Sequence, residues 1–576
     1  MIDGFSQDTD IAQNFKNIYS DIYNSHDDKD DLNQFIQDNN AKISQADLDI
    51  VEGITPQMVK RLINQFHNNK NDSNFNWKSD ALKLGVDLLA DPLCDLLSSL
   101  IIHGHIPKIF LICSLVPIVK DNNASKASSQ NYRLIAISSL ILKLFDHILL
   151  EVCRDSLMPS HHQFGFQKGL STGLCTWALN ETVNFFRNRG SPIFLCLMDL
   201  TKAFDMVKLS VLFNKLNNKV PPIFIRFLIF SYINQQCHVA WNGEKSTSFS
   251  ISNGVRQGAV ASPAMFNTYI NQLFDLLAAS GVGCKIDHLY YGVFAYADDI
   301  ALIAPSREGL QKMVDICDAF FTTHGIKIST SPIVKKTKTK IISFGVDVAA
   351  PTAITLGSKI LPYVTEWKHL GHVIHQDENP VHDLMEKKRE LTGKFHSLQQ
   401  ELGKQDPGVL MRLVKTYILH LYGCTLWDIF SEDSVKLWSE WHRIIKQAYQ
   451  LPIATHRWLL SDLLNGDHVK KMIIKRFLSF SKKISNSNIP HIALLHQYQC
   501  KDWRSTYGRN HMYICTEAQV ADISSVDISS IVVNPILPGE EWRAGMLRDI
   551  LTERECGDGV LTPDEVNLLL NTICCD

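Results

Sequence analysis

The sequence has no long apolar run. Hydrophobic residues make up 45% of its 576 residues, yet no stretch reaches the roughly 18 consecutive apolar residues that a membrane span needs. The N-terminal segment, MIDGFSQDTDIAQNF, also lacks the basic and then apolar pattern of an export signal. These absences predict a soluble, intracellular protein, and they do not separate nucleus from cytoplasm.

An excess of charge is also missing. The 57 basic and 60 acidic residues give a net charge of −3, so the whole chain carries no electrostatic signature of nucleic-acid binding. Such a surface would have to come from local clusters of Lys and Arg. The 14 cysteines are scattered, and without an export signal they are expected to be reduced thiols.

The chain is long enough for three or four domain-sized units. Residues 1–75 are polar and rich in Asp and Asn, with helical patterns only at 11–23 and 56–66, and we interpret them as an accessory segment. Further along, apolar patterns predict a helix that ends at Gly104, strands at 111–119, from 131 and at 341–344, and helices at 264–279 and 309–325. Residues 380–480 are helical and basic, which suits sugar-phosphate contacts. Their tryptophans are more typical of a core: Trp427, Trp438, Trp441 and Trp458.

An acidic pair stands in apolar surroundings. Asp298 and Asp299 lie between the apolar runs 289–295 and 300–304, which predicts a β-hairpin with both carboxylates at its tip. Neighbouring carboxylates repel each other and raise each other's pKa, so a chain that keeps both usually gives them a divalent cation. A solvated Asp-Asp turn is the alternative.

A third acid follows another apolar strand. Residues 194–198 are apolar throughout and end at Asp199, which indicates a buried strand. This aspartate either caps the following turn or binds a charged ligand. Two glycine-containing loops, at 163–169 and 253–258, would let the backbone approach a ligand or a phosphate closely.

Eight segments occur in the order typical of one enzyme family. From about residue 75 to about 465 the chain resembles the reverse transcriptase of LINE-type, non-LTR retrotransposons. The segments that carry the resemblance are VPIVK at 116–120, NYRLIAI at 131–137, QFGFQKG at 163–169, MDLTKAFD at 198–205, GVRQGAVASPAMFN at 254–267, AYADD at 295–299, KTKIISFG at 338–345 and KHLGHVI at 368–374.

The resemblance implies an α+β right-hand polymerase. Its palm would carry an antiparallel sheet, and its thumb would be helical. Fingers and palm would then occupy residues 76–345 and the thumb 346–465. Residues 466–576 would form a mostly helical C-terminal region.

The resemblance also implies the chemistry. Asp199, Asp298 and Asp299 would bind two Mg²⁺ ions, or Mn²⁺, and catalyse nucleotidyl transfer to a DNA primer on an RNA template. Three acids brought together by neighbouring strand ends are stable only around such cations. Further residues of the implied site are Lys120 and Arg133 on the dNTP triphosphate, Gln257 and Gly258 in the nucleotide pocket, Phe204 as the gate against a 2′-hydroxyl, and Lys338 as proton donor to pyrophosphate.

The chain departs from the family pattern in places. Leu134 stands where proline is usual, and Ser329 replaces a common asparagine. Residues 1–75 are too few and too poor in the needed motifs for the endonuclease domain that usually precedes this polymerase. A catalytically silent, element-derived protein that only binds nucleic acid is therefore the alternative function, and an intron-encoded maturase is a third.

Two C-terminal patterns indicate metal sites only weakly. The spacing of His496, Cys500, His511 and Cys515 is not that of a standard zinc finger, so zinc is not expected there. The segment 558–565 partly matches a calcium loop, but Arg554 and Cys556 would fill ligand positions. A helix beginning after Thr562 explains that segment better.

Overall fold

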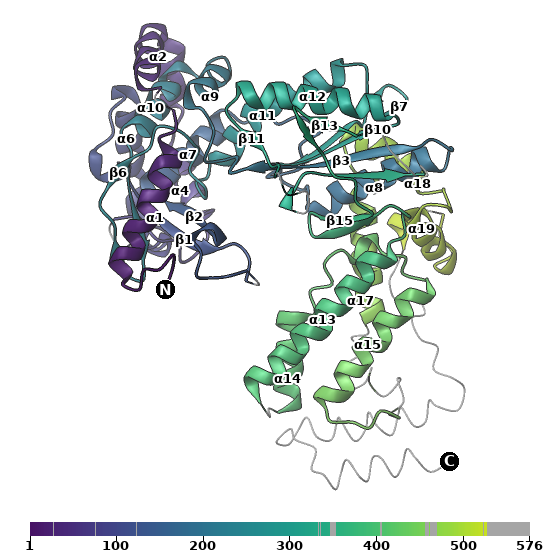
Figure 1. The fold of residues 1–576 in the computed structure, drawn as a ribbon. Helices are drawn as coiled ribbons and strands as arrows, with labels where there is room; N and C mark the ends of the chain where they lie inside the picture. The colour runs from purple at the N-terminus through teal and green to yellow at the C-terminus, as the bar shows by residue number, and fades with distance from the viewer. Residues whose placement is uncertain are drawn as a thin grey trace. The chain divides into compact units, whose positions relative to one another are not determined.

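The protein forms two compact units. A computed structural model describes residues 1–526 except 27, 75–76, 123, 332, 334–335, 346–352, 404–405, 456–459, 461–468 and 522. The first unit comprises Met1–Ser171, Phe194–Ile341 and Ala350–Pro362, and the second comprises Thr172–Ile193, Ile342–Ala349 and Tyr363–Asp576. Each unit contains helices and strands (Figure 1), so the expected α+β class is confirmed.

Four helices open the first unit where the sequence predicted only two helical patches. They are α1 (Asp8–Tyr23), α2 (Lys29–Lys42), α3 (Gln45–Glu52) and α4 (Pro56–Asn64). The prediction was wrong for α2 and α3. Helix α2 buries only Leu32 and Asn39, so it has almost no apolar periodicity to detect. Helix α3 begins at a capping box in which Ser44 and Asp47 satisfy each other's backbone donors.

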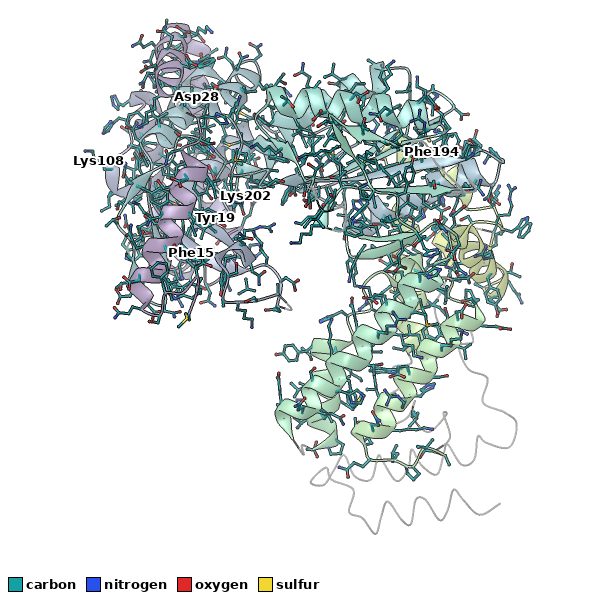
Figure 2. The ribbon with its side chains drawn as sticks, in the orientation of Figure 1. Phe15, Tyr19, Asp28, Lys108, Phe194 and Lys202 are labelled. Carbon is teal, nitrogen blue, oxygen red and sulfur yellow. The ribbon has the colours of Figure 1, made fainter. Side chains whose placement is uncertain are left out.

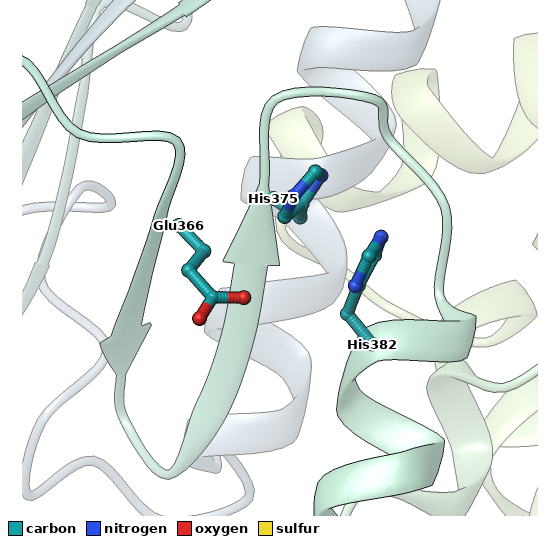
Figure 3. A group of neighbouring side chains, drawn as sticks. All are labelled: Glu366, His375 and His382. Atoms are coloured by element: carbon teal, nitrogen blue, oxygen red, sulfur yellow. The ribbon is translucent and has the colours of Figure 1, made fainter.

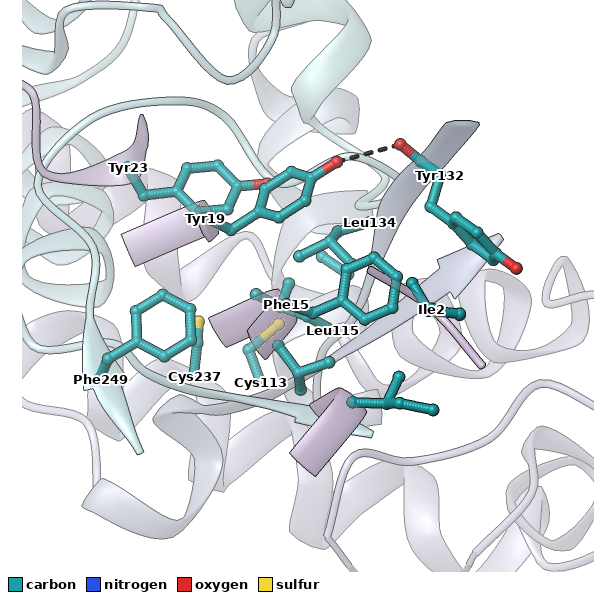
Figure 4. Packing of buried hydrophobic residues seen from close by; sticks show 13 residues of the cluster. Ile2, Phe15, Tyr19, Tyr23, Cys113, Leu115, Tyr132, Leu134, Cys237 and Phe249 are labelled. Atoms are coloured by element: carbon teal, nitrogen blue, oxygen red, sulfur yellow. Dashed lines mark hydrogen bonds between the residues drawn. The ribbon is translucent and has the colours of Figure 1, made fainter. Parts of the chain in front are cut away.

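The first sheet of this unit packs against α1. Its strands run in the order β2 (Tyr132–Ile137), β1 (Ile112–Val119), β4 (Gln236–Trp241) and β5 (Glu244–Lys245), with β6 (Phe249–Ser250) also on β4. The aromatic side chains of Phe15, Tyr19 and Tyr23 are buried against it (Figure 4). The N-terminal segment is thus polar in composition but supplies part of a core.

Further helices complete this part of the first unit. The predicted helix that ends at Gly104 is α6 (Val86–His103), and Gly104 adopts the left-handed conformation (φ 64°) that ends helices. The others are α5 (Ser79–Leu84), the 3₁₀ turns η1 (Lys108–Leu111) and η2 (Ser129–Asn131), α7 (Leu140–Val152), α9 (Leu209–Leu216) and α10 (Pro222–Ile233).

A second sheet lies under two helices. Its strands run in the order β11 (Lys327–Ile328), β3 (Ile193–Thr201), β10 (Asp299–Ala304) and β9 (Val293–Tyr296). The predicted helices are α11 (Ser262–Ala279) and α12 (Arg307–Thr323), which lie over one face of the sheet (Figure 1). The remaining strands are β12 (Lys340–Phe344), which crosses the unit boundary, and the short pairs β7 (Lys285–Ile286) with β8 (Leu289–Tyr290) and β13 (Thr355–Leu356) with β14 (Lys359–Ile360).

The second unit is mostly helical. One hairpin, β15 (Glu366–His369) with β16 (His372–His375), precedes the long helix α13 (Val381–Leu402). Trp427, Trp438 and Trp441 are buried, as their core assignment predicted, while Trp458 and the segment 558–565 lie outside the described residues. The other elements are α8 (Thr172–Arg187), α14 (Pro407–Leu413), the π-helical turn η4 (Val414–Ile418), the 3₁₀ turns η5 (Cys424–Leu426) and η6 (Ile523–Ser525), α15 (Glu432–Ala448), α17 (Val469–Ser485), α18 (Pro490–Gln499) and α19 (Thr506–Glu517).

No helix in the described part of the chain is both long and apolar enough to cross a membrane. The described cysteines are buried and form no disulfide with one another.

Candidate active site

The predicted acidic hairpin is present. Strands β9 and β10 pair antiparallel, with Tyr296 opposite Asp299 and Ala295 opposite Ile300. Ala297 and Asp298 form the connecting turn, and Ala297 adopts φ 57°. A residue with a Cβ rarely enters this left-handed region, so neighbouring contacts must hold the turn in place.

The loop 162–165 supplies those contacts. The side chain of Gln163 is fully buried. It accepts a hydrogen bond from the Ala297 N–H (2.8 Å) and donates one to the Ala297 carbonyl (3.3 Å). A Cβ at Gly165 would lie 2.3 Å from the Ala297 nitrogen, so only glycine fits there. The sequence predicted a loop near phosphates at 163–169, and this stays a prediction. In the structure Gln163 and Gly165 pack on the acidic turn, and Phe166 lines the cavity described below.

Strand register brings the third acid to the hairpin. Strands β3 and β10 pair antiparallel with Asp199 opposite Asp299. Opposite residues of an antiparallel pair point to the same face, with Cβ atoms about 5 Å apart. Asp199 does not close its strand as predicted, because β3 continues to Thr201 and pairs there with β11. Its side chain lines a cavity, which favours a ligand-binding role over that of a turn cap.

Burial and mutual repulsion alter the acidity of all three groups. Burial raises the pKa of Asp199 and of Asp298. The pKa of Asp299 rises to about 7 because the group is buried and because Asp298 and Asp199 are close by. Lys338 opposes these shifts, and its Nζ atom lies 3.8 Å from the Asp199 carboxylate. A partly buried acid cluster of this kind is characteristic of functional sites.

Two of these acids, Asp199 and Asp298, border a cavity of about 620 Å³ in the first unit. Lys120, which directly follows β1, and Arg133 on the neighbouring strand β2 line it together with Asp199 and Asp298. Burial and the nearby Arg133 lower the pKa of Lys120. Asp299 does not line the cavity, although it is the cross-strand partner of an acid that does. The remaining predicted residues that line it are Phe204, Gln257, Gly258 and Lys338.

One wall of the cavity is aromatic and glycine-lined. The Phe204 ring stacks on Phe266 at a centroid distance of 4.5 Å, which fixes its orientation. Gly258 adopts φ 101°, a conformation that favours glycine. The Gln257 carbonyl accepts a hydrogen bond from the Ala136 N–H (2.7 Å), so this turn is tied to β2.

Several cavity residues were missed by the sequence analysis. The buried Asp205 accepts hydrogen bonds from Gln257 (2.6 Å) and from the Tyr23 hydroxyl (3.0 Å). Tyr19 lines the cavity, and the Lys202 ammonium lies 5.4 Å from the centre of its ring (Figure 2). Only the repeated acid in MDLTKAFD could have indicated Asp205, because nothing in the sequence pairs α1 with residues so much later in the chain.

The donor set suits a hard divalent cation. All three acids offer carboxylate oxygens, the ligands that Mg²⁺ and Mn²⁺ prefer. The carboxylate oxygens of the three acids are not all within 4.8 Å of one another. Among the described residues, only Glu366, His375 and His382 form a group of possible ligands that close together. A set that serves two ions about 4 Å apart spreads more widely than the shell of one ion.

The four C-terminal zinc candidates do not form a compact donor set. The rings of His496 and His511 are 5.8 Å apart, and the Cys515 sulfur lies 3.9 Å from His511 Nδ1. Tyr507 is in hydrogen-bond contact with His496 Nδ1 at 3.0 Å. The expectation that zinc does not bind these residues stays a prediction.

Comparison with known families adds to the evidence from the geometry. Residues 120–374 match the family model described as "Reverse transcriptase (RNA-dependent DNA polymerase)". This stretch of the chain is similar to a reverse transcriptase domain. It includes every predicted site residue, from Lys120 to Lys338. Reverse transcriptase domains generally use divalent metal ions, in agreement with the donor set of the three acids.

Relatives of the reverse transcriptase domain are retrotransposon polyproteins. The chain is 25% identical over 295 residues to a Pol polyprotein from the type-1 element R2 of Nasonia vitripennis, covering 50% of this chain and 28% of that protein. It is 27% identical over 317 residues to one from the type-2 element R2DM of Drosophila melanogaster, covering 52% and 29%. It is 22% identical over 337 residues to the polymerase from the D. melanogaster mobile element jockey, covering 56% and 35%.

The chain spans less than a third of the length of the two R2 relatives. Among solved structures, apo telomerase from Candida tropicalis, truncated from the C-terminal domain, matches with a TM-score of 0.32 and 12% identity. That match covers 47% of this chain and 55% of the telomerase chain.

Proposed function

We propose that this chain is an RNA-directed DNA polymerase of the non-LTR retrotransposon type. It would extend the 3′-hydroxyl of a DNA primer with dNTPs on an RNA template. The observation that carries the proposal is the register of β3 and β10, which pairs Asp199 with Asp299. This pair stands beside a cavity that Asp199 and Asp298 line.

The resemblance to non-LTR reverse transcriptases assigns the fingers, palm and thumb of the polymerase to parts of the chain. Fingers and palm correspond to residues 76–345, the thumb to 346–465 and a C-terminal region to 466–576. Helix α1 adds a further wall to the fingers, because Tyr19 lines the same cavity as Arg133.

We assign two Mg²⁺ ions, or Mn²⁺, to Asp199, Asp298 and Asp299. The chemistry that such ions supply when bound is a lower pKa for an attacking 3′-hydroxyl and neutralisation of charge on the triphosphate. The pKa values of the three acids are raised, which means that their charged forms are unfavourable in the protein alone. A nearby cation would favour these charged forms, and this supports the assignment.

The other side chains bind and orient the incoming nucleotide and exclude a 2′-hydroxyl. Arg133 and Lys120 bind the triphosphate, and the planar guanidinium of Arg133 makes it the less replaceable of the two. Phe204, held by its stack on Phe266, excludes a 2′-hydroxyl and so selects deoxynucleotides. Gln257 and Gly258 form the nucleotide pocket, and Lys338 donates a proton to the departing pyrophosphate.

Primer extension tests the proposal. Wild type should extend a DNA primer on an RNA template with dNTPs and Mg²⁺, and Asp298→Asn should lose at least about a thousandfold in rate, comparable to removal of a main electrostatic group from an active site. Asp315→Asn, at an exposed position on α12, is the matched control and should keep full activity. Equal inactivity of wild type and Asp298→Asn, with duplex binding retained by both, would favour the silent nucleic-acid-binding protein.

A further inference from the structure

A second group of possible metal ligands belongs to the second unit, whereas the three acids belong to the first. Glu366 and His375 are cross-strand partners in the β15–β16 hairpin, so their side chains share one face. His382 is the second residue of α13 (Val381–Leu402). Figure 3 shows the three side chains converging on the space between the hairpin and the start of this helix.

The three side chains are within reach of one ion. One potential ligand atom from each residue lies within 4.8 Å of the others. The two imidazole rings stack with their centres 3.7 Å apart. Small rotations of these partly exposed side chains would bring the ligand atoms to the bond length of about 2 Å that zinc makes with imidazole and carboxylate.

Asp377 contacts one nitrogen of each ring. Its two carboxylate oxygens lie 2.7 Å from His375 Nδ1 and 2.8 Å from His382 Nε2. When an imidazole N–H donates a hydrogen bond to a carboxylate, the opposite ring nitrogen carries a lone pair. This holds His382 in one tautomer, whereas His375 Nδ1 also faces the Asp377 backbone N–H at 3.2 Å. Metal-binding histidines are usually oriented by a partner of this kind.

We propose that Glu366, His375 and His382 bind a divalent transition-metal ion, with Zn²⁺ as the best match. The ligand atoms we assign are Nε2 of His375, Nδ1 of His382 and a Glu366 carboxylate oxygen. Imidazole nitrogen favours zinc and its neighbours over Mg²⁺, which prefers an all-oxygen shell. The site therefore differs in chemistry from the three aspartates.

The bound ion would join two elements that the chain connects through a short loop. Residues 376–380 separate β16 from α13. Within them, Glu378 pairs with Arg187 of α8 at 2.8 Å. An ion held by both strands of the hairpin and by the first turn of α13 would fix the direction in which that helix leaves the hairpin.

Zinc uptake by the full chain tests the proposal. Metal-free protein in excess Mg²⁺ is titrated with Zn²⁺ against a chromophoric chelator. Wild type should bind one more equivalent than Glu366→Gln or His382→Gln, and Asp377→Asn should keep that equivalent with about 10- to 100-fold weaker affinity. His396→Gln, an exposed histidine on the same helix, is the matched control and should behave like wild type.

A measurement on wild type alone guards against misfolded variants. Hydrogen exchange of residues 376–382 should slow when Zn²⁺ is added and should not change with Mg²⁺. Equal zinc uptake by wild type and His382→Gln overturns the proposal, and so does unchanged exchange of this segment in wild type.

Discussion

The surroundings of Asp299 strongly alter its protonation. Its pKa of about 7 in the folded protein results from burial and from the neighbouring acids Asp298 and Asp199. An unfolded chain releases this proton near pH 4. Between these two values the folded state holds more protons than the unfolded state, so the free energy of unfolding falls as the pH rises.

Replacing Asp299 should therefore stabilise the protein when no metal is present. In Mg²⁺-free buffer at pH 8, we expect Asp299→Asn to raise the free energy of unfolding by about 1 kcal/mol or more, the equivalent of one pKa unit. At pH 4 the gain should largely vanish, because the wild-type group is then protonated when folded. Urea unfolding at both pH values measures the difference, and lower stability of the variant at pH 8 would contradict the assignment.

Phe204 is the residue that we propose selects the sugar of the incoming nucleotide. Phe204→Val should admit ribonucleotides, with discrimination against them falling about 10- to 100-fold, since a missing steric clash is typically worth about 1–3 kcal/mol. Primer extension with dNTPs and with rNTPs gives the ratio. Phe5→Leu is the control, because that exposed ring does not line the cavity and should not change the ratio. Unchanged discrimination against ribonucleotides in Phe204→Val would contradict the proposed role of Phe204.

At the scale of elements, the acidic turn depends on the loop that packs on it. A Cβ at Gly165 would collide with the backbone of Ala297, so Gly165→Ala must displace the turn that carries Asp298. We expect a loss of about 1–3 kcal/mol in stability, the usual cost of overpacking, together with a loss of polymerase rate. Gly393→Ala on α13 meets nothing within 4 Å and should be neutral or slightly stabilising. Equal behaviour of the two variants in thermal unfolding would contradict this account.

Helix α1 supports the cavity residue Asp205 through Tyr23. Its hydroxyl donates to the buried Asp205, which also binds Gln257. Tyr23→Phe should cost about 1–3 kcal/mol, because a buried carboxylate loses a donor, and should raise the KM for dNTP through Gln257. Tyr19→Phe removes a hydrogen bond to the Tyr132 carbonyl instead. Tyr19→Phe should leave the KM for dNTP unchanged. A raised KM in Tyr19→Phe but not in Tyr23→Phe would contradict the role assigned to Tyr23.

The sequence predicted elements whose apolar pattern is strong and missed those without one. The β9–β10 hairpin and the buried strand β3 stand out as apolar runs beside acids, so the acids could be found. The contacts of Gln163 with Ala297 and of Tyr23 with Asp205 join residues that are 134 and 182 positions apart. Such pairs leave no local trace in one sequence, since only the folded chain brings them together.

At the scale of the whole molecule, the proposed function requires nucleic-acid binding that comes from local charge. The net charge is −3, while the second unit has a cavity of about 450 Å³ lined by Lys368, Lys387 and Lys394. If this cavity contacts one phosphate through Lys394, Lys394→Ala should reduce the slope of log affinity against log salt by about 1. Lys436 is paired with Asp433, so Lys436→Ala should leave the slope unchanged. Filter binding of a nucleic-acid duplex over a salt series measures this slope for wild type and for both variants.

The pairing of Asp199 with Asp299 has a consequence for the gene. Side chains on a strand alternate between faces, so a shift of one residue turns each of them to the opposite face. Losing a single codon from β10 while its pairing with β3 is kept would turn Asp299 away from Asp199. Such a deletion would keep the reading frame and change the composition by one residue only. It would nevertheless separate Asp299 from Asp199.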